Sequence, residues 1–305
     1  MTGILKLSIV IPLYQSEDLL VELFTRLSGT LQSYSLENYE IIVIDDGSKD
    51  KTWEKVLEFY TTDLKLKAVK FSRNFGQHNA ITAGLERCTG EWIIVMDCDL
   101  QDRPEEIPNL LNKAIKGYDI VLAQRLTRKD TLFKRQTSKI FYRAFAYISG
   151  LKFEPGVGNF GVYNKQVIAA ILQYKENFRP FPIIVKVVGF KRIAIEVQHG
   201  RRFTGKSSYN NFGLIKGALN AIIYYSHRPI WLFLIIGLGT ISFILFLLVG
   251  VYFLAFQIAV KDLVLILIFL MSILSLNASL IGVYVSRIFI ESKNRPLFII
   301  EKELI

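Results

Sequence analysis

The chain has 305 residues, a net charge of +10 and a hydrophobic content of 51%, and its mean hydropathy is +0.33. So apolar a composition excludes an ordinary soluble domain. The only cysteines, Cys88 and Cys98, exclude a disulfide framework and a zinc site of the CxxC type. The positive charge fits either nucleic acid or an anionic membrane with phosphate ligands. Long apolar segments near the C-terminus favour the membrane, so we expect no nucleic-acid partner.

Strand-like and helix-like patterns alternate over roughly the first 124 residues. The expected strands cover residues 7–11, 39–44, 67–71, 92–96 and 119–123. The expected helices cover residues 18–31, 48–60, 78–87 and 104–115. This alternation predicts an α/β fold with a mostly parallel sheet that is covered by helices on both faces. Residues 126–202 are less regular, with a helix-like pattern at 134–148.

Two C-terminal segments are long enough to cross a bilayer. No charged residue occurs from Pro229 to Val260 or from Leu263 to Ser286, and about 20 apolar residues suffice for a span. Only Lys261 and Asp262 separate the two segments, which predicts a tight helical hairpin. Basic residues flank its open end: Arg228, Arg287, Lys293, Arg295 and Lys302.

The positive-inside rule places that open end in the cytoplasm. We therefore predict a multi-pass protein of the inner membrane in four parts. These are a cytoplasmic catalytic domain (1–210), an amphipathic interfacial helix (211–228), a transmembrane hairpin (229–290) and a cytoplasmic tail (291–305).

Acidic and polar clusters follow the expected strands, where α/β sheets bind ligands. Asp97 and Asp99 stand one residue apart at a strand end, so both carboxylates can point to one side. Carboxylate oxygens suit Mg²⁺ or Mn²⁺, which would bridge to a substrate diphosphate. A strand-to-turn boundary with capping aspartates is the alternative. Asp45 and Asp46 fit either a ribose or base contact or a simple turn.

Two basic segments can each be interpreted in two ways, as binding sites or as ordinary surface charge. Arg73 precedes Gly76 and an expected helix start, which suits anion binding, although a surface ion pair also explains it. The segment 201–209 contains Arg202 and Lys206 and is rich in hydroxyl groups. It fits a phosphate-binding loop or a basic run attracted to anionic lipid.

Five motifs occur in a fixed order along the chain. They are Ile-Val-Ile-Pro-Leu-Tyr, Val-Ile-Asp-Asp-Gly-Ser-Lys-Asp-Lys-Thr, Ser-Arg-Asn-Phe-Gly, Thr-Ala-Gly-Leu and Met-Asp-Cys-Asp-Leu-Gln-Asp-Arg-Pro-Glu. Together they resemble the family-two glycosyltransferases of GT-A fold. The sequence is most similar to their polyprenyl-phosphate branch, which includes dolichol-phosphate mannose synthase and bactoprenol glucosyltransferase. The resemblance covers almost the whole chain, including the apolar hairpin.

The resemblance implies a role for particular residues. It implies that Asp97 and Asp99 hold the metal and the donor diphosphate, and that Arg202 reaches the diphosphate from a flexible loop. The implied nucleotide-sugar site comprises Pro12, Tyr14, Glu17, Asp45, Asp46, Arg73, Asp97, Cys98, Asp99, Gln101 and Lys206. The implied acceptor-phosphate site comprises Arg125, Arg135 and Ser138.

Two departures from the family pattern concern the acceptor side. Asn159 stands where the family often has an aspartate. Ser208 stands where a loop lysine is expected, and Lys206 could take the place of that lysine. Because an amide is no general base, Asn159 favours an acceptor that is already anionic.

We therefore expect an inverting glycosyltransferase that moves a sugar from a UDP- or GDP-linked donor to a polyprenyl phosphate, such as undecaprenyl phosphate. The product would serve outside the cytoplasm, for example in a cell-envelope polysaccharide, and relatives suggest a homo-oligomer. Two alternatives are transfer to the hydroxyl of a lipid-linked saccharide, and a nucleotide-sugar-binding membrane protein without turnover.

Overall fold

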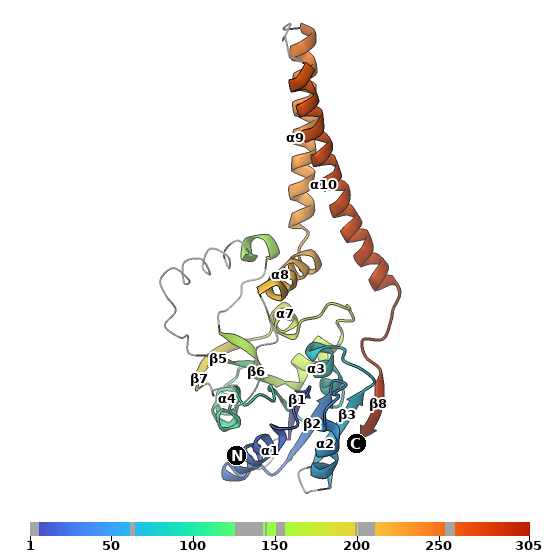
Figure 1. Cartoon of the computed structure of the whole chain (residues 1–305). Helices are drawn as coiled ribbons and strands as arrows, with labels where there is room; N and C mark the ends of the chain where they lie inside the picture. The colour runs from blue at the N-terminus through green and yellow to red at the C-terminus, as the bar shows by residue number, and fades with distance from the viewer. Residues whose placement is uncertain are drawn as a thin grey trace. The chain divides into compact units, whose positions relative to one another are not determined.

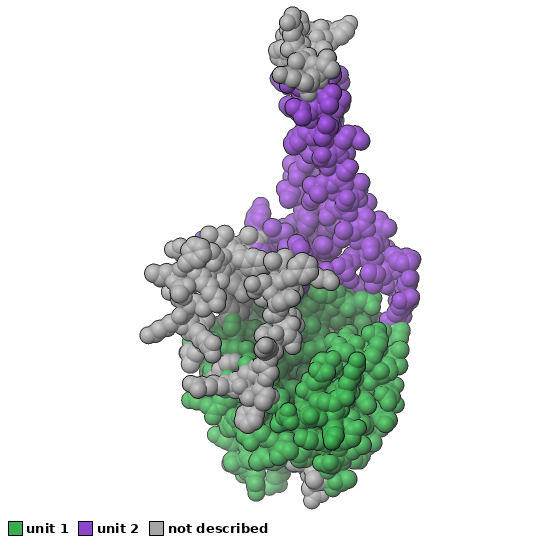
Figure 2. Space-filling model, in the orientation of Figure 1, with its two compact units in different colours: residues 1–131, 154–208, 296–305 green, residues 132–153, 209–295 purple. Residues whose placement is uncertain are grey.

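The computed structural model describes residues 6–61, 65–125, 143, 145–150, 156–198, 200, 211–253 and 260–305. Two compact units make up the chain (Figure 2). The first consists of Met1–Thr131, Glu154–Ser208 and Pro296–Ile305, and the second of Leu132–Phe153 and Tyr209–Arg295.

One eight-stranded sheet forms the centre of the first unit, in the order β7-β5-β6-β4-β1-β2-β3-β8 (Figure 1). The strands are β1 (Leu7–Leu13), β2 (Tyr39–Asp45), β3 (Leu66–Phe71), β4 (Trp92–Val95), β5 (Ile120–Arg125), β6 (Val157–Asn164), β7 (Arg192–Val197) and β8 (Ile300–Leu304). β4, β1, β2 and β3 run parallel to one another, as do β5 and β7. β6 and β8 are antiparallel to the strands they pair with.

Helices cover both faces of this sheet. The helices are α1 (Leu20–Ser33), α2 (Thr52–Tyr60), α3 (Gln77–Leu85), the 3-10 turn η1 (Pro104–Glu106), α4 (Ile107–Ala114), α6 (Lys165–Leu172) and α7 (Phe181–Val187). α1, α2 and α4 pack on one face and α3, α6 and α7 on the other. The side chains of β1 alternate between these two cores, with Ile9 in the first and Val10 in the second.

The predicted α/β fold with a mostly parallel sheet is confirmed, and the first five strands and four helices appear in the expected order. α1 shows why the pattern was informative. Its buried apolar residues, Leu20, Leu23, Phe24, Leu27 and Leu31, recur at helical spacing. Each such burial stabilises the fold by about 1.5–3 kcal/mol.

The end of the segment predicted as a tail is a strand. Ile300–Leu304 forms β8, which pairs antiparallel with β3 along the edge of the sheet. The ring of Phe298 stacks on that of Phe71 with 4.9 Å between centroids, and the Arg87 guanidinium donates to the Glu303 carboxylate. Pairing with β8 satisfies backbone groups that an open β3 edge would expose.

A buried carboxylate lies at the amino-terminal end of the central parallel strands. One oxygen of Glu40, at the start of β2, accepts hydrogen bonds from the Ser8 hydroxyl (2.5 Å), the Thr89 backbone N–H (2.6 Å) and the Thr89 hydroxyl (2.8 Å). Its other oxygen lies 3.0 Å from the Lys67 ammonium. Burial opposes ionisation, but these bonds outweigh it and lower the pKa of Glu40 to about 2.

Glu40→Gln should therefore destabilise the first unit by about 2–3 kcal/mol at pH 7. Because the folded pKa lies below the ordinary value of 4.5, the contribution is complete above about pH 4.5. It is lost as the pH falls toward 2, so the gap between variant and wild type should narrow there. Melting temperatures in detergent at pH 7 and pH 3 measure this, and equal melting temperatures at pH 7 would contradict it.

The second unit consists mainly of three C-terminal helices: α8 (Asn211–Tyr225), α9 (Arg228–Phe253) and α10 (Val260–Ser292). Within α9 and α10, residues Arg228–Gly250 and Asp262–Ser292 have mean hydropathies of 2.8 and 2.5, and almost none of their side chains is buried. A soluble core helix of this composition would be buried, so these surfaces fit contact with lipid. Lys261 and Asp262 lie in the first turn of α10.

Arg287 on α10 is held by side chains of α8. Its guanidinium donates to the Asn220 amide oxygen (2.5 Å) and the Tyr224 hydroxyl (3.3 Å). It also lies 4.8 Å from the centre of the Tyr224 ring, within range of a cation–π interaction. This predicted flanking residue therefore ties α8 to the end of the second candidate span.

Candidate active site

The loops after β1 and β2 are joined by hydrogen bonds. The Asp46 N–H donates to the Leu13 carbonyl (2.9 Å), and the Gln15 N–H donates to the Ser48 hydroxyl (2.9 Å). Because β4, β1, β2 and β3 are parallel neighbours, their carboxyl ends share one edge of the sheet. That edge is the usual ligand-binding edge of α/β sheets.

The predicted nucleotide residues on the β1 loop differ in exposure. Pro12 is buried in β1, whereas Tyr14 is 44% exposed. The Glu17 carboxylate accepts the Lys51 N–H (2.8 Å), and the Lys55 ammonium donates to the Glu17 carbonyl (2.7 Å). Glu17 thus also fixes the start of α2.

Asp45 and Asp46 have different partners. The Asp46 oxygens accept the backbone N–H groups of Phe75 (2.6 Å) and Gly76 (2.9 Å), which ties the end of β2 to the loop after β3. Burial raises the pKa of Asp46 to about 6, against these bonds. Asp45 Oδ1 accepts the Ser48 N–H, while Oδ2 is buried without a hydrogen-bond partner among the described residues. Asp45 therefore keeps a buried oxygen at this strand end that no described residue satisfies.

Asp97 lies at the centre of the candidate site. Its Oδ1 accepts hydrogen bonds from the Gln77 side-chain amide (2.6 Å), at the start of α3, and from the Asn159 amide (3.4 Å), on β6. Burial and the charge of Asp99 raise the pKa of Asp97, while Arg125 acts in the opposite direction. The Asn159 Oδ1 is buried without a partner in the described part of the chain.

A further carboxylate, Asp102, joins this cluster and was not among the predicted residues. It is 4% exposed, accepts the Asp97 N–H (3.2 Å) and lies 3.5 Å from the Arg125 guanidinium on β5. Burial, and then the Asp97 charge, raise its pKa to about 7. The sequence does contain the signal, a third acid after Asp97 and Asp99, but a loop aspartate is ordinarily a turn residue.

The remaining residues of this loop point in different directions. Asp99 Oδ1 accepts the Gln101 N–H (3.1 Å), so both predicted residues belong to one turn. The Cys98 thiol lies 3.2 Å from the Ser16 hydroxyl and packs against the core, and burial raises its pKa to about 11. Cys98 therefore has its backbone, rather than its thiol, available to a ligand.

Arg73 extends from the loop after β3. It is exposed, its guanidinium lies 4.1 Å from the centre of the Phe75 ring, and it forms no ion pair among the described residues. A cation held over a ring in this way stays available for an anionic ligand. The other predicted basic and hydroxyl residues, Arg135, Ser138, Arg202 and Lys206, lie outside the described residues.

The donor set fits a hard divalent cation that is shared with a substrate. No three His, Cys, Asp or Glu side chains among the described residues form a ready-made metal site. Asp97 and Asp99 offer carboxylate oxygens at one turn, and Mg²⁺ or Mn²⁺ commonly takes one or two carboxylates, with water and phosphate oxygens as the other ligands. A cation would also offset the burial that raises the pKa of Asp97.

Comparison with known proteins gives consistent matches. The profile of glycosyl transferase family 2 matches residues 8–172. A glycosyltransferase of Synechocystis sp. is 35% identical over 97% of this chain and 95% of its own. The undecaprenyl-phosphate 4-deoxy-4-formamido-L-arabinose transferase of Photorhabdus laumondii is 32% identical over 97% of this chain and 94% of its own.

A similar fold occurs in the glucosyl-3-phosphoglycerate synthase of Mycobacterium tuberculosis, crystallised with Mn²⁺, UDP and phosphoglyceric acid. The TM-score is 0.51 at 16% identity, over 73% of this chain and 78% of the other. Fold and relatives together define a glycosyltransferase of GT-A type. The chain belongs to glycosyl transferase family 2. The predicted resemblance to the polyprenyl-phosphate branch is confirmed by relatives that bear that activity in their names.

Proposed function

We propose that this enzyme transfers a sugar, with inversion, from a UDP- or GDP-linked donor to the phosphate of a polyprenyl phosphate such as undecaprenyl phosphate. The observation that carries the proposal is that Asn159 donates to Asp97, while Arg125 lies against the adjacent Asp102. A cation and an amide suit an anionic acceptor, whereas a hydroxyl acceptor needs a base. The named activity of the Photorhabdus laumondii relative supports the same acceptor.

On the donor side, the residues along the sheet edge would bind and orient the nucleotide-sugar. Tyr14 would contact the nucleoside, with Asp45 behind it at the end of β2, and Arg73 would attract the diphosphate. Asp97, Asp99 and Gln101 belong to the loop that would lie beside the diphosphate. Mg²⁺ or Mn²⁺ held by Asp97 and Asp99 would stabilise negative charge on the leaving group.

On the acceptor side, an oxygen of the lipid phosphate would attack the anomeric carbon. A bond forms from this oxygen to the carbon, and the bond from the carbon to the donor diphosphate breaks, which releases UDP or GDP. The phosphate needs no deprotonation by the protein, because its second pKa is about 6. Arg125, held by Asp102, would bind the phosphate, and Asn159 would orient Asp97 without acting as a base.

The membrane segments would keep this site at the lipid headgroups. α9 and α10 are long and apolar enough to span, and the basic residues at their open end favour the cytoplasmic face of the inner membrane. The Arg287 contacts with α8 support an interfacial position for that helix.

The proposal is tested by a donor screen on the full-length protein in detergent. UDP- and GDP-sugars are incubated with undecaprenyl phosphate and Mg²⁺ or Mn²⁺, and lipid-linked product is detected by mass spectrometry. One donor should give product that disappears on chelation. Undecaprenol, which lacks only the phosphate, should give none.

Each other outcome points to a named alternative. Product with undecaprenol or a lipid-linked saccharide would indicate a hydroxyl acceptor and overturn the role given to Asn159. Nucleotide-sugar binding without transfer to any lipid would indicate a binding protein.

A further inference from the structure

The segment that leads into β8 is bound to the loop that follows β3. The Ser72 N–H, just beyond the end of β3, donates to the Ile299 carbonyl (3.0 Å). Within the sheet, β8 pairs with β3 as far as Phe71, which lies opposite Ile300 after a shift in register. The C-terminal segment therefore holds the backbone of β3 up to the residue that precedes Arg73.

A row of three aromatic rings continues from this segment to Arg73. The ring of Phe298 stacks on that of Phe71, with 4.9 Å between centroids and 12° between planes. The ring of Phe71 lies edge-to-face with that of Phe75 at 5.7 Å, and the Arg73 guanidinium lies 4.1 Å from the centre of the Phe75 ring. Phe71 is fully buried, whereas Phe75 and Phe298 are half-buried. Both ring geometries are favourable ones, so each ring helps to fix the next.

The backbone of Phe75 connects this row to the predicted nucleotide site. The Phe75 N–H donates to Asp46 Oδ1 (2.6 Å), and the Gly76 N–H donates to Asp46 Oδ2 (2.9 Å). A shift of Phe75 would therefore displace the Arg73 guanidinium and the two amides on Asp46 together. The profile of the family matches residues 8–172, so it includes this loop but not Phe298.

We propose that Phe298 is a positioning residue for the donor. Through the two further rings, it holds the loop after β3 (residues 72–76) so that Arg73 and Asp46 are aligned with the nucleotide. This role rests on the proposed function, in which Arg73 attracts the donor diphosphate. Arg73 forms no ion pair within the described part of the chain, so the Phe75 ring is the main contact that directs its charge.

Phe298→Ala should weaken nucleotide binding about fivefold, the size typical of coupling through packed side chains. Without its stacking partner the loop becomes less ordered, so a ligand must order it on binding. At saturating donor, kcat should change by less than about twofold, because the contacts concern binding rather than the reacting atoms. Phe298→Tyr keeps the ring and should retain the nucleotide Kd within about twofold. Calorimetric titration with UDP and GDP, on the full-length protein in detergent, measures these affinities.

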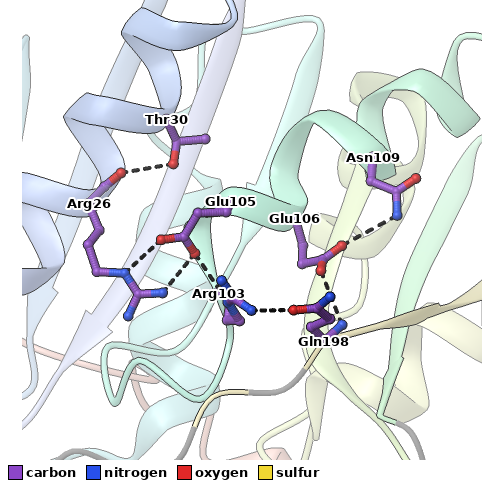
Figure 3. Close-up of polar contacts among 7 residues, drawn as sticks. All are labelled: Arg26, Thr30, Arg103, Glu105, Glu106, Asn109 and Gln198. Carbon is purple, nitrogen blue, oxygen red and sulfur yellow. Dashed lines mark hydrogen bonds and ion pairs between the residues drawn. The ribbon is translucent and has the colours of Figure 1, made fainter.

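Two control variants separate this effect from a general loss of stability. Leu304 lies at the far end of β8, opposite Ala68, and packs on the core of the other sheet face from Phe298. Leu304→Ala should lower the melting temperature, as Phe298→Ala does, but leave the nucleotide Kd unchanged. Arg26→Gln removes an exposed pair on α1, in which two hydrogen bonds of 2.7 Å reach the Glu105 carboxylate (Figure 3). It should match wild type in both measurements.

A double-mutant cycle tests whether Phe298 acts through Arg73. Arg73→Gln should weaken nucleotide binding by itself, because the diphosphate loses a cation. Once that cation is absent, its alignment no longer matters, so Phe298→Ala should then have a smaller effect than it has in the wild type. Losses in affinity that simply multiply would show that Phe298 does not act through Arg73, and would overturn the proposal.

Amide hydrogen exchange at Phe75 and Gly76 gives a readout that needs no ligand. Exchange should accelerate in Phe298→Ala and stay unchanged in Leu304→Ala and Arg26→Gln. Unchanged nucleotide affinity in Phe298→Ala, or an equal loss in Leu304→Ala, would overturn the proposal. If the wild type bound neither UDP nor GDP, the proposed function would fail, and the exchange data would still decide whether Phe298 holds the loop.

Discussion

Asp97→Asn should lower kcat by about 10³-fold or more while leaving the melting temperature of the metal-free enzyme equal to wild type or higher. The carboxylate is half-buried beside Asp99 and Asp102, and its desolvation with the Asp99 charge raises its pKa. A neutral amide removes that repulsion, so the variant should be at least as stable as the wild type although it is less active. Such opposite effects are typical of functional sites. Enzyme assays and thermal melting in detergent with a chelator measure the two quantities.

The matched control is Glu40→Gln, a carboxylate at the opposite end of the same strands. It should lose stability and keep its activity per folded molecule, which is the reverse of Asp97→Asn. Mg²⁺ or Mn²⁺ should raise the melting temperature of the wild type, because a ligand that binds the folded state stabilises it. The same ions should not affect Asp97→Asn. An Asp97→Asn enzyme that stays active, or that melts well below wild type without metal, would contradict the assignment.

The central part of the fold could be predicted because its signals are local. β1, β2 and β4 are apolar runs, of which β2 and β4 lead into acids, and α1 repeats its apolar residues at helical spacing. β8 could not be predicted in the same way. It is Ile-Glu-Lys-Glu-Leu, whose charged residues suit an exposed edge and read as a tail. β6 was missed because its antiparallel place between β4 and β5 is a property of topology, which no short window of sequence contains.

The candidate site, too, could be predicted only where its signals are local in the sequence. The motifs predicted that Asp45, Asp97 and Asp99 follow strands, and the structure brings those strand ends to one edge. The motifs did not predict that Asp46 binds the Phe75 and Gly76 amides, or that Asp102 lies between Asp97 and Arg125. These contacts join residues from different strands, so they depend on tertiary packing. The roles of Arg135, Ser138, Arg202 and Lys206 stay predictions.

Gly47→Ala should cost about 2–4 kcal/mol of stability and weaken nucleotide binding about tenfold or more. Gly47 has a φ of +67°, and a Cβ there would lie 2.3 Å from the Arg73 carbonyl carbon and 2.7 Å from the Asn74 nitrogen. These are backbone atoms, so the loop after β3 must move as a whole. Its movement would break the two amide hydrogen bonds to Asp46. It would also shift Gln77, whose side chain donates to Asp97.

Two other glycines separate the possible causes. Gly29 lies in α1 with nothing within 4 Å of its Cβ position, so Gly29→Ala should be neutral or stabilising by up to about 1 kcal/mol. Gly76 has a φ of +97° but open space around it, so Gly76→Ala should show the cost of backbone strain alone. Thermal melting and calorimetric titration with UDP and GDP measure all three variants. If Gly47→Ala resembled Gly76→Ala in both measurements, backbone strain alone would explain the need for glycine at position 47. A larger loss in Gly47→Ala, above all in nucleotide affinity, would mean that the close contact between the loops after β2 and β3 shapes the nucleotide site.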